Sequence, residues 1–433
     1  MKKNKYQHFE EICPDIFLHY NALSNNFLLL SKGKHSIYEN STAQELEKND
    51  EKLFQLLVLN KFLVEDNMDE TLLTLQAKEQ MIQNKELYNV FINTTLDCNL
   101  NCWYCYENRI ENSKLSIETI DIIKKNINRH YQSCPYKTLK VSFFGGEPFM
   151  DFNGIQTILN FAKEFCEQKD IELIADFTTN ATLITKEIID YLKQFRCHFQ
   201  ITLDGGRDTH NRIKKCRFGE MDTYQKAIDT LQWIDTEISK RWIAVRINFD
   251  NHTLRCIDEI IHDISFLDRT KCYVIVKKVW QLETGKVDRE ALMSAIQKLF
   301  DNRFLVDYYL MPKGCVCFAE RKNETLFNYD GKIFKCTTIS TFDDKNKLGN
   351  ADMKTGEIHW DTKKMEDWYR DMQPDYCKSC HWFPVCLGIC NRQIMAHPNE
   401  KICTFDACSL TQKEYLMYLF KYNQLKYEIY ENQ

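Results

Sequence analysis

From Val90 to Trp280 the sequence alternates short apolar runs with amphipathic segments, and this alternation restricts the fold more than any other feature of the chain. The segment "SIETIDIIKKNINRHY", for example, has apolar residues at helical spacing between two strand-like runs. Strands that alternate with helices predict a parallel sheet. The runs that read as strands are "VFINTTL", "LKVSFFGGEP", "IELIADFTTN", "HFQITLDGG", "WIAVRINFDN" and "CYVIVKKVW".

Six strand–helix units are too few for a closed eight-fold barrel. We therefore expect an α/β fold built on an open, partial (β/α)6 TIM-like barrel. In barrels of this kind the chemistry collects at the carboxyl ends of the strands. The residues that fall at these predicted ends are Cys98, Gly145, Asn180, Asp204 and Asn248.

The segments on either side of the barrel have a different character. Residues 16–31, "IFLHYNALSNNFLLLS", predict two short strands around a polar turn, and the stretch that follows predicts two helices and a short strand. After about residue 300 the sequence breaks into cysteine-rich pieces with little periodicity, for which bound metal is the usual source of order. We expect three domains, over residues 1–88, 89–300 and 301–433.

The composition of the 433 residues narrows the class of protein. With 44% hydrophobic and 27% charged residues the chain is an ordinary globular protein, and its net charge of −5 does not suggest nucleic acid as a partner. No apolar run approaches the roughly 18 residues of a membrane span. The start of the chain has no apolar region typical of a signal peptide. We expect a cytoplasmic protein that binds neither membrane nor nucleic acid.

Against that background, the 19 cysteines point to metal or catalysis, because disulfides do not persist in a reducing compartment. Three of them lie within "TTLDCNLNCWYCYENR", and nine lie between Cys315 and Cys408. The other seven are isolated, and most are expected at ordinary core or surface positions: Cys13, Cys134, Cys166, Cys197, Cys216, Cys256 and Cys272.

The first group, Cys98, Cys102 and Cys105, has the spacing C-x3-C-x2-C. An iron–sulfur cubane normally takes four thiolates, so three leave one iron open to another ligand. The alternative is a zinc site completed by a histidine elsewhere in the chain. Iron is favoured by "FFGGEPFM", which ends the second predicted strand.

In that second motif, Gly145 and Gly146 have no Cβ and let a ligand approach the backbone, while Glu147 supplies an acceptor. The cysteine triplet after the first strand and the GGE turn after the second resemble the signature of radical S-adenosylmethionine (SAM) enzymes. The resemblance covers roughly residues 90–300.

The resemblance implies that the triplet holds a [4Fe–4S] cluster whose open iron chelates the amino and carboxylate groups of SAM. Gly145, Gly146 and Glu147 would contact the methionine amino group. Cleavage of SAM would give a 5′-deoxyadenosyl radical that abstracts a substrate hydrogen. Asn180, Asp204 and Arg246, also at strand ends, would contact cosubstrate or peptide. Alternatively, they cap strands or form ion pairs.

The second cysteine group has the pattern C-x13-G-x4-C followed by C-x2-C-x5-C-x3-C. This pattern resembles the SPASM extension of peptide-modifying radical SAM enzymes, although the C-x2-C pair alone would also suit a zinc ribbon. The resemblance implies two auxiliary [4Fe–4S] clusters. The first would be held by Cys317, Cys336 and Cys390, with Cys315 as a plausible fourth ligand. The second would be held by Cys377, Cys380 and Cys386, with Cys408 preferred to Cys403 as the fourth.

Two kinds of SPASM enzyme are considered for this chain, and they differ in their substrates. Sulfatase maturases, which make formylglycine, usually carry Asp after the cysteine of the G-x4-C element, where this chain has Thr337. Maturases of ribosomally made peptides are favoured instead. The N-terminal residues resemble their winged-helix-like leader-recognition domain, whose exposed strand edge would take up a leader peptide. Alternatively, these residues form an extension that only stabilises the protein.

We therefore expect a radical SAM peptide maturase that installs a cross-link, either a thioether or a carbon–carbon bond. Peptide epimerisation and decarboxylation are the alternatives. Its partners would be a precursor peptide, bound through its leader, and an electron donor such as flavodoxin or ferredoxin. A non-enzymatic electron carrier would explain the cysteines but not the open triplet. No G-x-G-x-x-G follows a strand, so a flavin is not indicated.

Overall fold

The computed structural model describes residues 1–279, 287–308, 315–370 and 372–431. The chain forms two compact units. The first, here called the barrel unit, joins Gln83–Tyr308 to Phe318–Trp368. The second, called the terminal unit, joins Met1–Ile82, Tyr309–Cys317 and Tyr369–Gln433, so the two ends of the chain share one unit.

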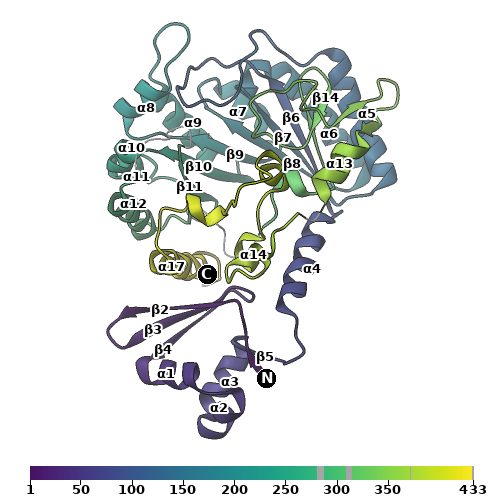
Figure 1. The fold of residues 1–433 in the computed structure, drawn as a ribbon. Coiled ribbons are helices and arrows are strands. Elements are labelled where there is room, and N and C mark those ends of the chain that lie inside the picture. Colours follow the sequence, from purple (N-terminus) through teal and green to yellow (C-terminus); the bar gives the residue numbers. More distant parts are fainter. Residues whose placement is uncertain (280–286, 309–314, 371, 432–433) are drawn as a thin grey trace. The chain divides into compact units, whose positions relative to one another are not determined.

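The six predicted strands form a parallel sheet in the barrel unit, as expected (Figure 1). The last predicted strand ran on to Trp280, which lies outside the described residues. The strands, in their order across the sheet, are β6 (Leu87–Thr95), β7 (Thr138–Gly145), β8 (Glu172–Thr179), β9 (Arg196–Thr202), β10 (Arg241–Phe249) and β11 (Cys272–Lys278).

The sheet continues beyond these strands on both sides. β12 (Val306–Asp307) pairs with β11, and β13 (Glu324–Phe327) pairs in parallel with β6. The short antiparallel strands β14 (Lys332–Phe334), β15 (Gly349–Ala351) and β16 (Ile358–Trp360) follow β13. Among the described strands the order runs from β12 to β16, which leaves the sheet open. Residues 301–433 therefore contribute to both units.

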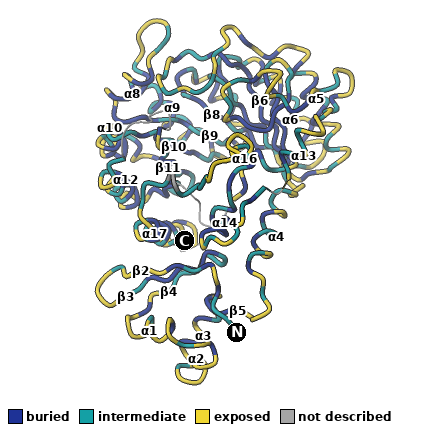
Figure 2. The backbone as a smooth tube through the Cα atoms, viewed as in Figure 1, coloured by how far each residue is buried: buried dark blue, intermediate teal, exposed yellow. Residues whose placement is uncertain are grey.

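The helices of the barrel unit follow the strand–helix rhythm. In α5, the Ser116 side chain accepts the backbone N–H of Thr119 at the helix start, and Ile122, Ile123 and Ile127 form the buried face. The strands are buried along most of their length (Figure 2). The helices are α5 (Ile117–Ser133), α6 (Phe152–Lys169), α7 (Lys186–Leu192), α8 (Arg207–Ile213), α9 (Thr223–Glu237), α10 (Asn251–Arg255), α11 (Ile257–Asp263), α12 (Arg289–Asp301) and α13 (Thr362–Tyr369).

The N-terminal part of the terminal unit contains an antiparallel sheet of β2 (Gln7–Cys13), β3 (Ile16–Asn21) and β4 (Asn26–Ser31). The predicted pair of strands around a turn is confirmed, and so is the helix–helix–strand order from Thr42 on, but a further helix over Lys32–Asn40 was not predicted. β2, whose sequence "QHFEEIC" is half charged or polar, was not predicted. The remaining elements are β1 (Lys2–Lys3), β5 (Leu63–Val64), α1 (Lys32–Asn40), α2 (Ala43–Asn49), α3 (Glu51–Leu59) and α4 (Glu70–Ile82).

The C-terminal part of the same unit is made of short elements and one long helix. Asn25, in the turn after β3, donates from its amide to the Asn423 side chain of the long helix at 3.0 Å. The elements are α14 (Asp375–Lys378), α15 (Phe383–Cys386), α16 (Asn391–Ala396), a 3-10 turn (Thr404–Ala407) and α17 (Gln412–Tyr430). None of the helices in the described parts of the chain has the length and apolar character of a membrane span.

Candidate functional site

The cysteine triplet lies on the loop that begins where β6 ends, at the carboxyl edge of the parallel sheet. The Cys105 N–H donates to the Cys102 carbonyl at 3.1 Å, which folds the loop into a turn. The thiols are close enough to interact. Burial first, then the charge of Glu147 and those of Cys102 and Cys105, raise the pKa of Cys98 to about 12. A cation at this position would offset these effects and favour the thiolates.

Asp97 holds the start of this loop. Its buried carboxylate accepts the N–H of Cys98 at 2.8 Å and of Asn112 at 2.9 Å, and it pairs with Arg217 at 2.6 Å. Leu100 also forms an antiparallel bridge to the segment that contains Arg217. The sequence does not predict this support, because Arg217 is far along the chain and belongs to no recognisable motif.

The two glycines of the GGE turn let β7 touch the cysteine loop. A Cβ at Gly146 would lie 2.1 Å from the Asp97 carbonyl oxygen, and one at Gly145 would lie 2.0 Å from that of Thr95. Instead the Gly146 N–H donates to Thr95 at 3.0 Å. The space that a side chain would need is therefore filled by the backbone of the cysteine loop. From the sequence, we expected these glycines to let a ligand approach the backbone, not the cysteine loop.

Glu147 joins the ends of two neighbouring strands. Its fully buried carboxylate accepts the N–H of Asn180 and the hydroxyl of Thr179, both at 2.7 Å, and burial raises its pKa to about 7. Asn180 in turn donates from its side chain to Asn99 at 2.9 Å and to the Cys98 thiol at 3.8 Å. The structure thus brings Glu147 and Asn180 together with the triplet.

Asp204 is at the centre of a buried polar network on the next strands. Its carboxylate accepts the Tyr104 hydroxyl and the Asn248 N–H, the latter at 3.0 Å. Lys214 lies 3.7 Å from the same carboxylate, and neither side chain is appreciably exposed. Burial opposes the charge of Lys214, but Tyr104, Cys102 and Asp204 outweigh it and hold its pKa well above the ordinary value.

Lys214 is a site residue that the sequence does not reveal, because it stands in a polar run, "HNRIKKCR", that reads as surface. Arg246, by contrast, was considered as a ligand contact. Its side chain donates to Asn248 at 2.8 Å, two residues along the same strand.

Two further polar atoms on the cysteine loop are buried. Glu107 Oε1 and Arg109 Nε have no hydrogen-bond partner among the described residues. Burial raises the pKa of Glu107 to about 7. The three thiols are thus accompanied by the carboxylate of Glu107 and by two cations, Lys214 and Arg109. This set of groups fits a cluster that keeps one iron open for a ligand with both an amino group and a carboxylate. Among the described residues, no three Cys, His, Asp or Glu side chains converge as they would around a single ion.

The C-terminal cysteines divide between the units. Within the terminal unit, burial and then the charges of Cys380, Cys377 and Cys403 raise the pKa of Cys386 to about 11, so these four thiols are neighbours. Cys408 affects the pKa of Tyr415, as Cys386 does. The other predicted ligands are Cys315, Cys317 and Cys390 in the terminal unit and Cys336 in the barrel unit.

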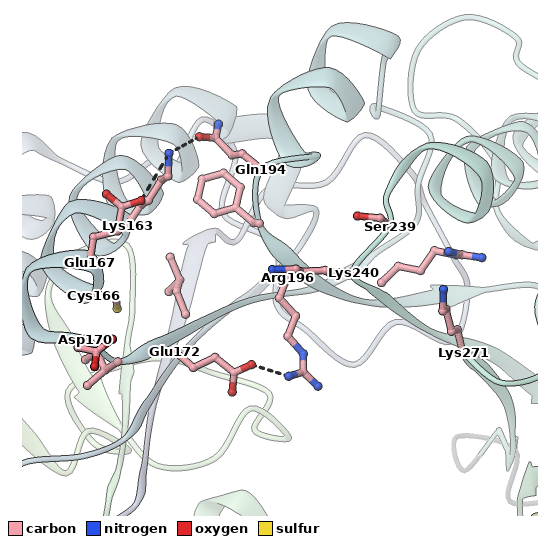
Figure 3. Close-up of a pocket in the computed structure, with 14 residues that line it drawn as sticks. Lys163, Cys166, Glu167, Asp170, Glu172, Gln194, Arg196, Ser239, Lys240 and Lys271 are labelled. Atoms are coloured by element: carbon pink, nitrogen blue, oxygen red, sulfur yellow. Dashed lines mark hydrogen bonds and ion pairs between the residues drawn. The ribbon is translucent and has the colours of Figure 1, made fainter. Parts of the chain in front are cut away.

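A depression of about 660 Å³ lies elsewhere in the barrel unit, at the amino ends of the strands (Figure 3). Glu172 and Arg196, which begin β8 and β9, form an ion pair there, and Lys163 donates to Gln194 at 3.0 Å. None of the predicted site residues lines this depression. Because barrel chemistry belongs to the opposite strand ends, it is not the candidate site.

The sequence of this chain is similar to those of several known proteins. Residues 92–264 match the profile of the radical SAM superfamily. The chain is 22% identical over 330 residues to the cysteine-type anaerobic sulfatase-maturating enzyme of Clostridium novyi, covering 68% of this chain and 85% of that enzyme. It is 29% identical over 127 residues to the radical SAM cyclopropyl synthase TigE of Paramaledivibacter caminithermalis, 26% of each chain.

The fold is also similar to that of the solved structure of native anSMEcpe with bound AdoMet and the Cp18Cys peptide. The TM-score is 0.58 at 18% identity, and the match covers 80% of this chain and all of that one.

Proposed function

We propose that this chain, whose residues 92–264 form a radical SAM domain, is a peptide maturase that installs a cross-link in a ribosomally made precursor. The observation that carries the proposal is the loop after β6, where three interacting thiols lie beside a buried carboxylate and a buried lysine. A thioether and a carbon–carbon bond are both compatible with this chemistry.

Cys98, Cys102 and Cys105 would hold a [4Fe–4S] cluster, which together with SAM supplies a 5′-deoxyadenosyl radical for hydrogen abstraction. The residues of the chain itself would hold SAM in place and balance the charges of its carboxylate and amino groups. Lys214 is a buried cation whose charge reaches Cys102, and it is suited to a carboxylate. Glu107 has a free carboxylate oxygen suited to an amino group.

Other predicted ligand contacts would act by fixing the loop. Glu147 is fully buried and bonded to Thr179 and Asn180, and Asp204 is fully buried and bonded to Tyr104. We assign both carboxylates as positioning groups that hold strand ends against the triplet. The backbone of Gly145 and Gly146 is the remaining candidate for contact with the methionine amino group.

The N-terminal sheet supports a peptide as the substrate. Its β2 edge carries Glu10 and Glu11, has a bulge, and receives a hydrogen bond at the Glu11 carbonyl from Lys413 at 2.6 Å. The opposite edge, β4, has the uncharged sequence "NFLLLS" with Leu29 53% exposed. Charge and bulges protect a strand edge from pairing, so β4 is the edge fitted to accept a leader strand.

A formylglycine-generating sulfatase maturase is the second candidate, because relatives of that kind match two thirds of the chain. Against it, the residue after Cys336 is Thr337, which cannot serve as a carboxylate base. The Thr337 carbonyl accepts the Tyr106 hydroxyl at 3.3 Å, within the barrel unit that contains the triplet. Incubation with a cysteine-containing sulfatase peptide and with the precursor encoded nearby would separate the two candidates.

The remaining cysteines would hold two auxiliary clusters. One would use Cys317, Cys336 and Cys390, with Cys315 as a plausible fourth ligand. The other would use Cys377, Cys380 and Cys386. For its fourth ligand we retain Cys408 as the sequence-based choice, while the shared electrostatics of the thiols supports Cys403.

The deciding experiment is the metal content of anaerobically reconstituted protein. Three cubanes predict about 12 irons per chain, falling to about 8 when the triplet cysteines are replaced by alanine. Cleavage of SAM should disappear in that variant. About 4 irons together with zinc would refute the auxiliary clusters. An unchanged rate of SAM cleavage would refute the central assignment.

A further inference from the structure

Within the terminal unit, residues 377–390, here called the C-terminal cysteine segment, pack directly on the N-terminal sheet. Trp382 stands between Cys380 and Cys386, and its ring stacks on the ring of His8 from β2. The two ring centroids are 3.6 Å apart and the rings are inclined by 22°. Both side chains are buried, at 8% and 5% exposure. The N-terminal part of this unit, Met1–Ile82, is here called the N-terminal module. One of its residues therefore forms part of the core beneath the cysteine segment.

The backbone of the segment is bound by two residues at the start of β2, Gln7 and the preceding Tyr6. The hydroxyl of Tyr6, which is fully buried, donates to the Lys378 carbonyl at 3.0 Å, directly after Cys377. The His381 ring nitrogen lies 3.3 Å from the Gln7 carbonyl oxygen. These contacts hold the backbone on both sides of Cys380.

Lys78 of α4 reaches the other end of the segment. Its ammonium donates to the Leu387 carbonyl at 2.9 Å, and Leu387 directly follows Cys386 in a left-handed conformation with φ 53°. The lysine is only 9% exposed. The ammonium of Lys78 is therefore buried against the carbonyl of the residue that directly follows Cys386.

We propose that the N-terminal module is a structural and electrostatic part of the C-terminal iron–sulfur site, with Lys78 and His8 as its positioning residues. The proposal rests on the function proposed above, since it assumes that Cys377, Cys380 and Cys386 hold a cluster. A module that only recognised a leader would have no need of a buried ammonium beside thiols. A cubane with thiolate ligands carries net negative charge, and nearby charge and hydrogen bonds set its reduction potential.

The test uses the full chain with the triplet cysteines replaced by alanine, so that only the auxiliary clusters remain. Lys78→Met should make the reduction potential of one cluster more negative, because reduction adds an electron where a positive charge has been lost. The reduction potential of the other cluster should not change. Lys78→Arg should restore the potential, and Lys48→Met, at an exposed position on α2, is the matched control. The readout is an anaerobic redox titration followed by electron paramagnetic resonance.

His8 supplies an independent measurement. His8→Ala should lower the iron bound in this background from about 8 toward about 4 per chain, and His8→Phe, which keeps an aromatic ring against Trp382, should restore it. Unchanged potentials in Lys78→Met together with full iron in His8→Ala would overturn the inference. If the parent variant binds no iron at all, the proposed auxiliary clusters fail instead, so the two failures are distinguishable.

Discussion

The two cysteine-rich sites of this chain are supported in different ways. The triplet lies at the ends of parallel strands, where the backbone of Gly146 touches the loop directly and the Asp97 carboxylate accepts the Cys98 N–H. The C-terminal segment has only short helices of its own. It is held by side chains such as Trp382 and Gln373, which are near the cysteines in sequence, and Lys78, which is about 300 residues away. The first site is therefore anchored to a parallel sheet, whereas the second depends on side-chain packing without such a sheet.

Truncating the central aromatic residue should have the largest effect on stability. Trp382 contacts His8, Phe405 and Tyr415, so Trp382→Ala should lower the free energy of unfolding of the terminal unit by about 3–5 kcal/mol. Chemical denaturation followed by circular dichroism measures this loss. Tyr427→Ala, at a 52% exposed position on α17, should change it by less than about 0.5 kcal/mol. Equal effects of the two variants would contradict the view that side chains hold the terminal site.

Adding a methyl group to the GGE turn tests the backbone-based site. In Gly146→Ala the new Cβ would lie 2.1 Å from the Asp97 carbonyl oxygen, which cannot rotate away. We expect a cost of about 3 kcal/mol, the upper end for overpacking, and loss of the irons bound at the triplet. Iron content and the rate of SAM cleavage are the measurements.

The control is Gly33→Ala on α1, where a Cβ would meet no atom within 4 Å. Alanine there should be neutral or stabilise by up to about 1 kcal/mol. If Gly146→Ala behaved in the same way and kept its irons, the close approach of β7 to the cysteine loop would not be what positions the triplet.

The contrast between regular structure and long-range side-chain contacts also explains which parts of the fold and of the sites could be predicted from the sequence. The order and direction of β6 to β11 followed from local periodicity, because each strand is a buried apolar run followed by a helix. The strands β13 to β16 are three or four residues long, too short to show a pattern. The roles of Lys214 and Lys78 depend on partners far away in the chain, so no window of sequence contains them.

Acid should weaken the terminal unit through its buried histidines. Burial, with the charge of His35, lowers the pKa of His19 from 6.5 to about 3. The unfolded chain therefore binds this proton between pH 6.5 and pH 3 while the folded chain does not, and stability falls as the pH falls through that range. From pH 7 to pH 5 the loss is about 2 kcal/mol.

The variant His19→Phe removes the titrating group and keeps an aromatic ring next to Tyr38 and Phe62. Its free energy of unfolding should therefore fall less between pH 7 and pH 5 than that of the unaltered chain. The pKa of His8 is also lowered to about 3, so part of the pH dependence of stability should remain in this variant. Identical pH profiles for the two proteins would show that His19 does not remain neutral in the folded chain.

The smallest effects test whether the two ends of the chain unfold as one body. Thr42 is the N-cap residue of α2, and Thr411 is that of α17. Each forms a capping box with the glutamate three residues later. Ser116 caps α5 in the barrel unit. Replacing any one of them by alanine should cost about 1 kcal/mol.

The informative result is which thermal transition moves. If the N-terminal module and the C-terminal cysteine segment form one cooperative unit, Thr42→Ala and Thr411→Ala should lower the same transition by similar amounts, and Ser116→Ala should lower a different one. Differential scanning calorimetry resolves this, since each cap acts only on the unit that contains its helix. Separate shifts for Thr42→Ala and Thr411→Ala would mean that the stack of His8 on Trp382 joins two bodies that unfold independently. Lys78 and His8 would then reach the C-terminal site only across a separable interface.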